Sequence, residues 1–136
     1  LSEYPGGRFF SRMAEWVEDG FSVEGAKALL LNHAIPWKER EAGERITLYG
    51  LEKNCIGRYS YKGRMTDSWR QILSHVDPNE VSEKDIKWFE ACRSSLRKIY
   101  SASTVKELRS EVFSFLFRFW PAEERMSTSC ISERLA

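Results

Sequence analysis

Apolar side chains recur every three or four positions along most of this chain, which is the spacing of one buried helical face. In the first third they predict a helix over residues 8–19, ended by Gly20, and a second helix from an N-cap at Ser22 to about residue 33. Pro36 suits the first turn of a short third helix over 36–41. The N-terminal part is therefore predicted to be helical.

The second half of the chain predicts three further helices from the same periodicity. The first follows a cap at Thr66 or Asp67 and runs through residue 76, and the second opens at Ser82. The third starts with a capping box at Thr104, where the side chains of residues 104 and 107 would satisfy two free amides reciprocally, and Pro121 stops it.

Between these helical regions the pattern changes to alternating β-forming residues. Residues 46–51 predict one strand, 52–54 a turn and 55–61 the returning strand, with 62–64 closing the hairpin. The predicted class is mainly α (α+β): a single compact domain over 8–120 with five or six helices and one central β-hairpin near 45–62. An irregular N-terminus (1–7) and a flexible C-terminal tail (121–136) flank it. Three helices before a hairpin is also the order of a winged helix, so the N-terminal half could be winged-helix-like.

Composition supports one globular domain rather than a disordered chain. The 136 residues are 42% hydrophobic and 30% charged, and the formal net charge is only +1, so overall charge points to no partner. The cysteines Cys55, Cys92 and Cys130 are isolated, which fits an intracellular protein, cytoplasmic or nuclear, and not a zinc site. No apolar run reaches the ~20 residues of a membrane span, so we expect no membrane association.

Positive charge is concentrated in one segment. Residues 53–70 hold five Lys or Arg and a single acid, interleaved with aromatic residues. Cations neutralise phosphates and aromatic rings stack on bases, so this segment is a candidate surface for DNA or RNA. In a strand, Arg58, Ser60 and Lys62 would share one face, and Tyr59 and Tyr61 the other. The alternative is a solvated hairpin whose tyrosines pack onto the helices. With two cations of the predicted third helix, the candidate nucleic-acid-binding residues are Lys38, Arg40, Lys53, Arg58, Tyr59, Tyr61, Lys62 and Arg64.

The last predicted helix is apolar nearly all round, from Val112 to Trp120. It is either central in a bundle or partly an interface, most simply that of a homodimer. The candidate interface residues are Phe113, Phe117 and Trp120.

Catalytic chemistry has little support. His33 and His75 are the only histidines, and no phosphate loop, nucleophile elbow or metal-ligand pattern occurs. We therefore expect no enzyme activity, no cofactor and no metal. The leading hypothesis is a small nucleic-acid-binding or regulatory accessory protein that uses the basic, aromatic hairpin. The competing hypothesis is a protein-binding adaptor or inhibitor that uses the aromatic C-terminal helix.

Overall fold

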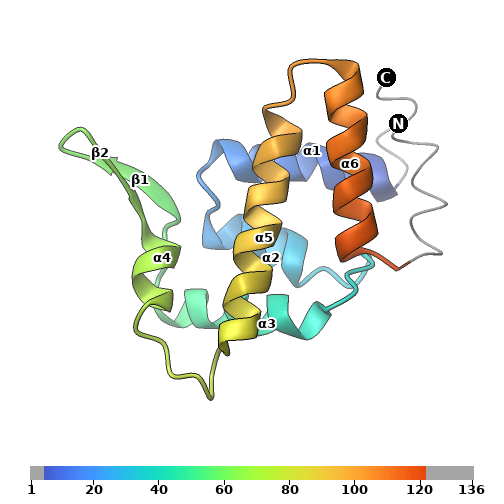
Figure 1. Ribbon diagram of the computed structural model, residues 1–136. Coiled ribbons are helices and arrows are strands. Elements are labelled where there is room, and N and C mark those ends of the chain that lie inside the picture. Colours follow the sequence, from blue (N-terminus) through green and yellow to red (C-terminus); the bar gives the residue numbers. More distant parts are fainter. Residues whose placement is uncertain (1–4, 122–136) are drawn as a thin grey trace.

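The computed structural model describes residues 5–121, apart from the side chains of residues 5–8 and Tyr61. Within that range the chain is mainly helical with a single two-stranded antiparallel hairpin, as predicted (Figure 1). The elements in chain order are α1 (Pro5–Glu18), α2 (Val23–Leu30), α3 (Arg40–Glu52), β1 (Arg58–Tyr61), β2 (Arg64–Asp67), α4 (Ser68–Leu73), α5 (Glu83–Tyr100) and α6 (Val105–Phe119). No helix in this part of the chain is long and apolar enough to cross a membrane.

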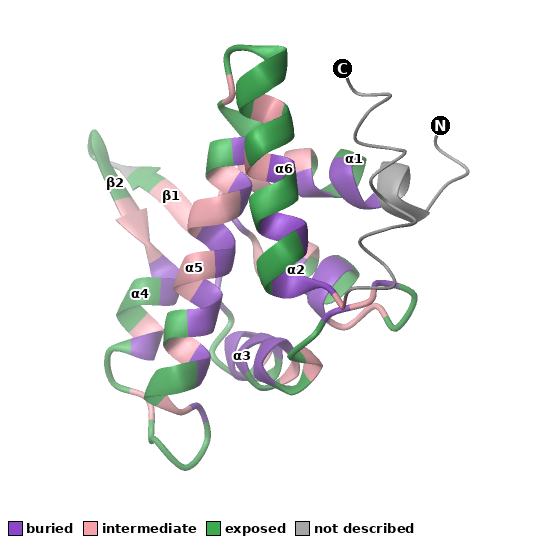
Figure 2. Ribbon diagram, turned by 45° about the vertical axis from the view of Figure 1, so that its right-hand side comes forward, coloured by how far each residue is buried: buried purple, intermediate pink, exposed green. Residues whose placement is uncertain are grey.

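The core forms where α5 packs against α1, α3 and α6, while α2 packs against α1 and α3. Figure 2 shows the buried faces of these helices turned toward one another. All five tryptophans are buried, and indole N–H groups reach backbone carbonyls: Trp16 donates to Ser22 (2.8 Å) and Trp37 to Leu29 (2.7 Å). Large rings thus fill the core, and the polar atoms of Trp16 and Trp37 keep hydrogen-bond partners there.

The strand predicted over residues 46–51 is wrong, because this segment belongs to α3. Its buried positions include Ala42, Gly43, Ile46, Thr47 and Gly50, which follow helical spacing rather than alternation. The Thr47 hydroxyl donates to the Gly43 carbonyl one turn earlier (2.7 Å), so this buried hydroxyl has a hydrogen-bond partner in the core. Helical packing decides the outcome over the β-propensity of the sequence.

The short third helix predicted over residues 36–41 is also wrong. Residues 31–39, between α2 and α3, form no helix or strand, and α3 begins at Arg40. Trp37 is buried there, and the Lys38 amide donates to the Phe119 carbonyl at the end of α6 (2.8 Å). The buried Trp37 side chain and the Lys38 backbone hydrogen bond fix this connection to the core without a helix.

The hairpin exists but lies further along the chain than predicted. Arg58 faces Asp67 and Tyr61 faces Arg64, so residues 62–63 are the turn between the strands. Both turn residues have positive φ (51° and 77°), as in the two-residue turns that match strand twist. The predicted alternation of side chains between the two strand faces therefore ends at Tyr61, and Lys62 belongs to the turn.

The base of the hairpin is anchored to the turn between α1 and α2. The Arg58 amide donates to the Gly20 carbonyl (2.6 Å), and the Ser68 amide donates to the Gly57 carbonyl (3.0 Å). Gly57 has φ of 80°, and a Cβ there would lie 2.6 Å from the Gly20 oxygen. Only glycine allows the two backbones to approach this closely.

The predicted helix starts are mostly correct, and the ends differ. Ser22, Asp67, Ser82 and Thr104 are N-cap residues, and Ser82 forms a capping box with Asp85. The reciprocal bond predicted for the last helix goes instead from the amide of residue 103 to the carboxylate of residue 107 (2.9 Å).

Three helix boundaries differ from the predictions. The first helix begins at Pro5 rather than residue 8, so residues 5–7 are not irregular. The helix α2 ends at Leu30 and α4 at Leu73, both earlier than predicted. The predicted tail lies outside the described residues, except for Pro121.

Candidate functional site

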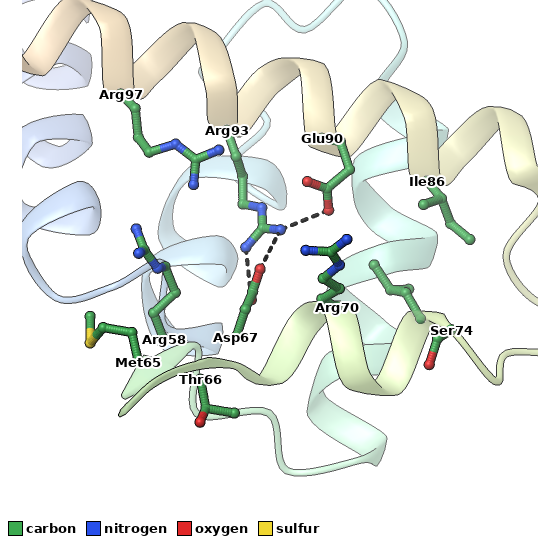
Figure 3. Close-up of a pocket in the computed structure, with 11 residues that line it drawn as sticks. Arg58, Met65, Thr66, Asp67, Arg70, Ser74, Ile86, Glu90, Arg93 and Arg97 are labelled. Carbon is green, nitrogen blue, oxygen red and sulfur yellow. Dashed lines mark hydrogen bonds and ion pairs between the residues drawn. The ribbon is translucent and has the colours of Figure 1, made fainter. Parts of the chain in front are cut away.

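A cavity of about 610 Å³ opens between the β-hairpin, α4 and α5 (Figure 3). The strands contribute Arg58, Met65, Thr66 and Asp67; α4 and its C-cap contribute Arg70, Leu73 and Ser74; and α5 contributes Ile86, Glu90, Arg93 and Arg97. Four of these side chains are arginines and two are carboxylates. We call this cavity the arginine pocket.

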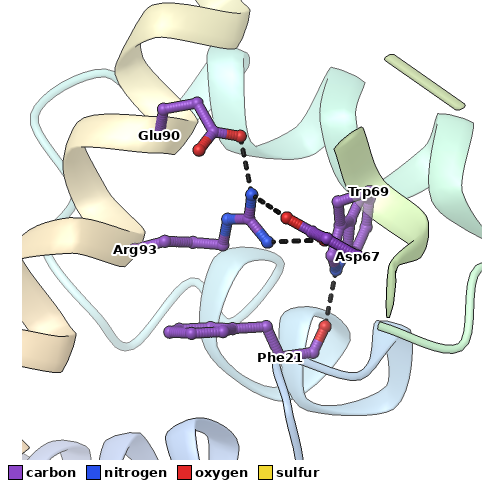
Figure 4. Close-up of polar contacts among 5 residues, drawn as sticks. All are labelled: Phe21, Asp67, Trp69, Glu90 and Arg93. Carbon is purple, nitrogen blue, oxygen red and sulfur yellow. Dashed lines mark hydrogen bonds and ion pairs between the residues drawn. The ribbon is translucent and has the colours of Figure 1, made fainter. Parts of the chain in front are cut away.

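Arg93 binds both carboxylates of the arginine pocket (Figure 4). Its guanidinium donates two hydrogen bonds to Asp67 (3.0 and 2.9 Å) and one to Glu90 (2.7 Å), although only 1% of the residue is exposed. The same group lies over the rings of Phe21 and Phe89, 5.5 and 5.0 Å from their centroids. A buried cation is tolerable only with such partners, so this network ties α5 to the start of α4.

The charge of Asp67 reflects this pairing. Burial alone would raise its pKa, but the hydrogen bonds and charge of Arg93 outweigh burial and hold the pKa below its usual value. Asp67 is therefore ionised at neutral pH, and its charge is neutralised by Arg93 from within the protein.

The remaining arginines give the pocket its positive character. Among the described residues, no ion pair involves Arg58, Arg70 or Arg97. Figure 3 shows Arg58 rising from β1 and Arg97 descending from α5 toward the same space, while Arg70 reaches up from α4. Three elements thus bring three guanidinium groups to one cavity.

Arg97 shows that these positive charges are crowded. Its pKa lies below the usual arginine value, first because it is partly buried and then because Arg93 and Arg58 repel its charge. Its guanidinium lies 5.6 Å from the ring centroid of Phe21, so an apolar ring covers one side of this cation. An anion in the pocket would relieve the repulsion.

The structure separates the predicted nucleic-acid-binding residues. Arg58 lines the pocket, while Lys62 and Arg64 are exposed at the far end of the hairpin. Tyr59 is half-buried on β1, and the side chain of Tyr61 lies outside the described residues.

The other three predicted residues lie away from the pocket. Lys53 caps the end of α3, with its ammonium 5.6 Å from the ring centroid of Tyr49. Lys38 is exposed in the connection before α3. Arg40 donates to the backbone carbonyls of Asn32 (3.1 Å) and Ile35, so its guanidinium holds this connection in place.

Sequence reasoning missed Arg93 and Arg97, and counted Arg70 among the basic residues without assigning it to the site. One signal was available: Arg93 follows Phe89 by four positions and precedes Leu96 by three, where the buried face of α5 calls for an apolar residue. A charged residue in an apolar stripe indicates a buried partner, which here is Asp67.

The predicted interface on α6 divides into an exposed and a buried part. Phe113 is 44% exposed and Phe117 is 70% exposed, whereas only 2% of Trp120 is exposed. The Trp120 ring packs against those of Phe9 and Phe115, with centroids 5.1 and 6.0 Å apart. The assignment of Trp120 to an exposed interface was therefore wrong, since it belongs to the core.

Metal binding has no structural support in the described part of the chain. There, no three or more His, Cys, Asp or Glu side chains are grouped so that they could hold an ion. His33 and His75 are both exposed, on separate segments.

Comparison with known proteins identifies the family. Residues 2–133 match the family described as Treponema TP0900 fourth helical domain, and the chain belongs to it. It is also 32% identical over 81 residues to a protein of Treponema pallidum (strain Nichols) that carries the name "Uncharacterized protein". That alignment covers 59% of this chain and 10% of the relative, so this chain spans only a small part of the longer protein. No solved structure matches the chain.

Proposed function

We propose that this domain is a non-catalytic nucleic-acid-binding module, of a regulatory or accessory kind, that holds phosphate groups with the arginine pocket and the adjoining hairpin. The observation that carries the proposal is the convergence of Arg58, Arg70 and Arg97 on one cavity whose two carboxylates are occupied by Arg93. A guanidinium presents a planar fork of N–H donors that matches the oxygens of a phosphate.

The hairpin extends this positive surface. Lys62 and Arg64 are exposed beyond the pocket, and Arg58 at the other end of the ribbon lines it. Arg64 pairs with Tyr61, so it lies on the opposite face of the ribbon from Arg58 and Met65. Cations spread along a ribbon suit a chain of regularly spaced phosphates better than one small anion. The exposed Met65 lies on the same ribbon and offers an apolar contact for a sugar or base.

The test is the salt dependence of oligonucleotide binding. Replacing Arg58, Arg70 and Arg97 together by Gln should weaken binding of a single-stranded oligonucleotide and flatten the slope of log affinity against log salt. The expected change in slope is about 0.7 for each phosphate contact that is lost, because fewer counterions are released. Fluorescence anisotropy at several salt concentrations measures both quantities.

The matched control removes three positive charges from exposed positions that do not line the pocket: Lys84→Gln, Lys106→Gln and Arg109→Gln. This variant should keep most of the affinity. Equal losses in the two variants would mean that only net charge matters. Absence of binding to any DNA or RNA at low salt would refute the proposal.

A protein-binding adaptor or inhibitor is the second candidate function, and one observation favours it. Val105, Phe113 and Phe117 are all exposed on α6 at multiples of four positions, which places them in one row on the helix. Large exposed aromatic residues supply much of the binding energy at protein interfaces. Separately from that function, we propose that two copies of the chain associate through this row as a homodimer.

A further inference from the structure

We infer that the arginine pocket binds the terminal phosphate of a nucleic-acid strand, a phosphomonoester, rather than a phosphodiester within the strand. This inference rests on the proposed function and adds the chemical group that the pocket recognises. It follows from the shape of the pocket, its charge and its lining.

The shape favours the end of a strand. Arg93 is almost fully buried and held by Asp67 and Glu90. In Figure 3 this network lies in the middle of the cavity, between Arg58 and Arg97 on one side and Arg70 on the other. A phosphodiester must lead the chain in and out past the same arginines, whereas a terminal phosphate enters with one connection only.

The charge favours the same group. A phosphomonoester carries about −1.5 to −2 charges at neutral pH and three strongly accepting oxygens, whereas a phosphodiester carries one charge. Arg58, Arg70 and Arg97 supply three guanidinium groups, and the carboxylates nearby are already bound by Arg93. Burial and then repulsion by Arg93 and Arg58 lower the pKa of Arg97, and the more highly charged group offsets this repulsion better.

The lining leaves room for more than a phosphate. Met65, Leu73 and Ile86 form an apolar part of the wall. A volume of about 610 Å³ also lies within the range typical of pockets for whole small molecules. The sugar or base of the terminal nucleotide can therefore pack beside its phosphate.

The test compares three single-stranded oligonucleotides of one sequence, each about twelve nucleotides long, with an internal fluorophore. One carries a 5′-phosphate, one a 3′-phosphate, and one has hydroxyls at both ends. We expect one phosphorylated form to bind at least about tenfold more tightly than the hydroxyl form, because charge-assisted hydrogen bonds are gained. The two phosphorylated arms show which end the pocket accepts.

The variants Arg58→Gln and Arg97→Gln should abolish this preference while the hydroxyl oligonucleotide still binds through the hairpin. The control Lys84→Gln with Lys106→Gln should keep the preference. Circular dichroism establishes that each variant is folded before its binding is compared, and Arg58→Lys provides a milder substitution if the glutamine variant unfolds.

A pH series gives a readout that a purely structural arginine would not move. The preference should shrink as the pH falls below about 6, where a phosphomonoester takes up its second proton and a phosphodiester does not change. Of the residues that line the pocket, the ionisable ones are arginines and the two carboxylates bound by Arg93, and no histidine is among them.

The outcomes separate the inference from the proposed function. Equal affinity of all three oligonucleotides for the wild-type protein would overturn the inference and leave nucleic-acid binding standing. Failure of all three to bind would overturn the proposed function, and with it the inference. Free nucleoside monophosphate should compete with the phosphorylated oligonucleotide, and failure to compete at millimolar concentration would also count against a phosphomonoester site.

Discussion

At the scale of single residues, the arginine pocket depends on one buried cation. Arg93 is 1% exposed and is the hydrogen-bonding partner of both Asp67 and Glu90. Its single charge offsets one of the two carboxylates, and the four arginines that line the pocket outnumber the two carboxylates. The pocket therefore stays positive although both carboxylates take part in the contacts that stabilise the fold.

Asp67→Asn should destabilise the protein by about 3 kcal/mol, the lower end of the cost of removing one partner from a buried ion pair. The lower end applies because Glu90 still binds Arg93. Urea denaturation followed by tryptophan fluorescence measures the change. Glu83→Gln is the control, since its ion pair with Lys87 is exposed, and it should leave the midpoint nearly unchanged. Similar midpoints for the two variants would contradict the assigned role of Asp67.

The buried Asp85 and the half-buried Asp67 also predict how stability depends on pH. The pKa of Asp85 is lowered first by its hydrogen bonds from Arg45, and that of Asp67 by Arg93 against the effect of burial. A carboxylate with a lowered folded-state pKa contributes stability above its unfolded value of about 3.9, and loses it as the pH falls through the folded value.

Unfolding free energy should therefore decrease from about pH 4 downward. The decrease should be shallower in Asp67→Asn and in Asp85→Asn, because each variant lacks one titrating group. Urea midpoints measured at several pH values test this. Parallel curves for the wild type and both variants would show that other groups dominate acid unfolding.

At the scale of elements, the sequence predicts where the helices start, but it does not predict that residues 46–51 are helical rather than a strand. Caps act through local hydrogen bonds, so Ser22, Ser82 and Thr104 could be identified from their immediate neighbours. The helix α3 depends on a partner far along the chain. Its Gly50 lies against the Trp69 indole, a contact that no local pattern reveals.

That contact gives a prediction for Gly50→Ala. A Cβ at residue 50 would lie 2.4 Å from the Trp69 ring, which is fully buried and donates its indole N–H to the Phe21 carbonyl. The overpacking should cost about 1–3 kcal/mol, more than the ~1 kcal/mol that alanine gains over glycine within a helix.

Gly43→Ala is the matched control in the same helix, because its nearest contacts are at 3.3 Å. Thermal unfolding should give a clearly lower midpoint for Gly50→Ala than for Gly43→Ala. Equal midpoints would show that the indole has room to shift.

The candidate site shows the same division between local and distant information. Arg58 and Arg70 belong to the basic segment that a count of charges reveals. Arg93 and Arg97 come from α5, more than twenty positions later, and only folding brings them to the hairpin. Arg40 belonged to the predicted set, but local backbone contacts already occupy its guanidinium. Composition identifies where charge is concentrated, whereas tertiary contacts decide which charges remain available.

At the scale of the whole molecule, two surfaces stand out. The arginine pocket lies beside the hairpin, and the exposed row of α6 lies on a different part of the helical body (Figure 2). The two proposals assign nucleic acid to the first surface and a protein to the second. Disrupting one should therefore leave the other intact.

The row on α6 predicts self-association that two substitutions remove. Phe113→Ser combined with Phe117→Ser should shift the protein from dimer to monomer at micromolar concentration, because an isologous interface loses these residues twice. Stability of the folded chain should change little, since the core residues of α6 are Val112, Phe115, Leu116 and Phe119.

Sedimentation velocity measures the shift. Leu48→Ser is the control, an exposed apolar residue on α3, and it should leave the dimer unchanged. The double variant should also keep the oligonucleotide affinity of the wild type, because neither phenylalanine lines the arginine pocket. A wild-type mass equal to one chain across the concentration range would exclude a second copy as the partner of this row.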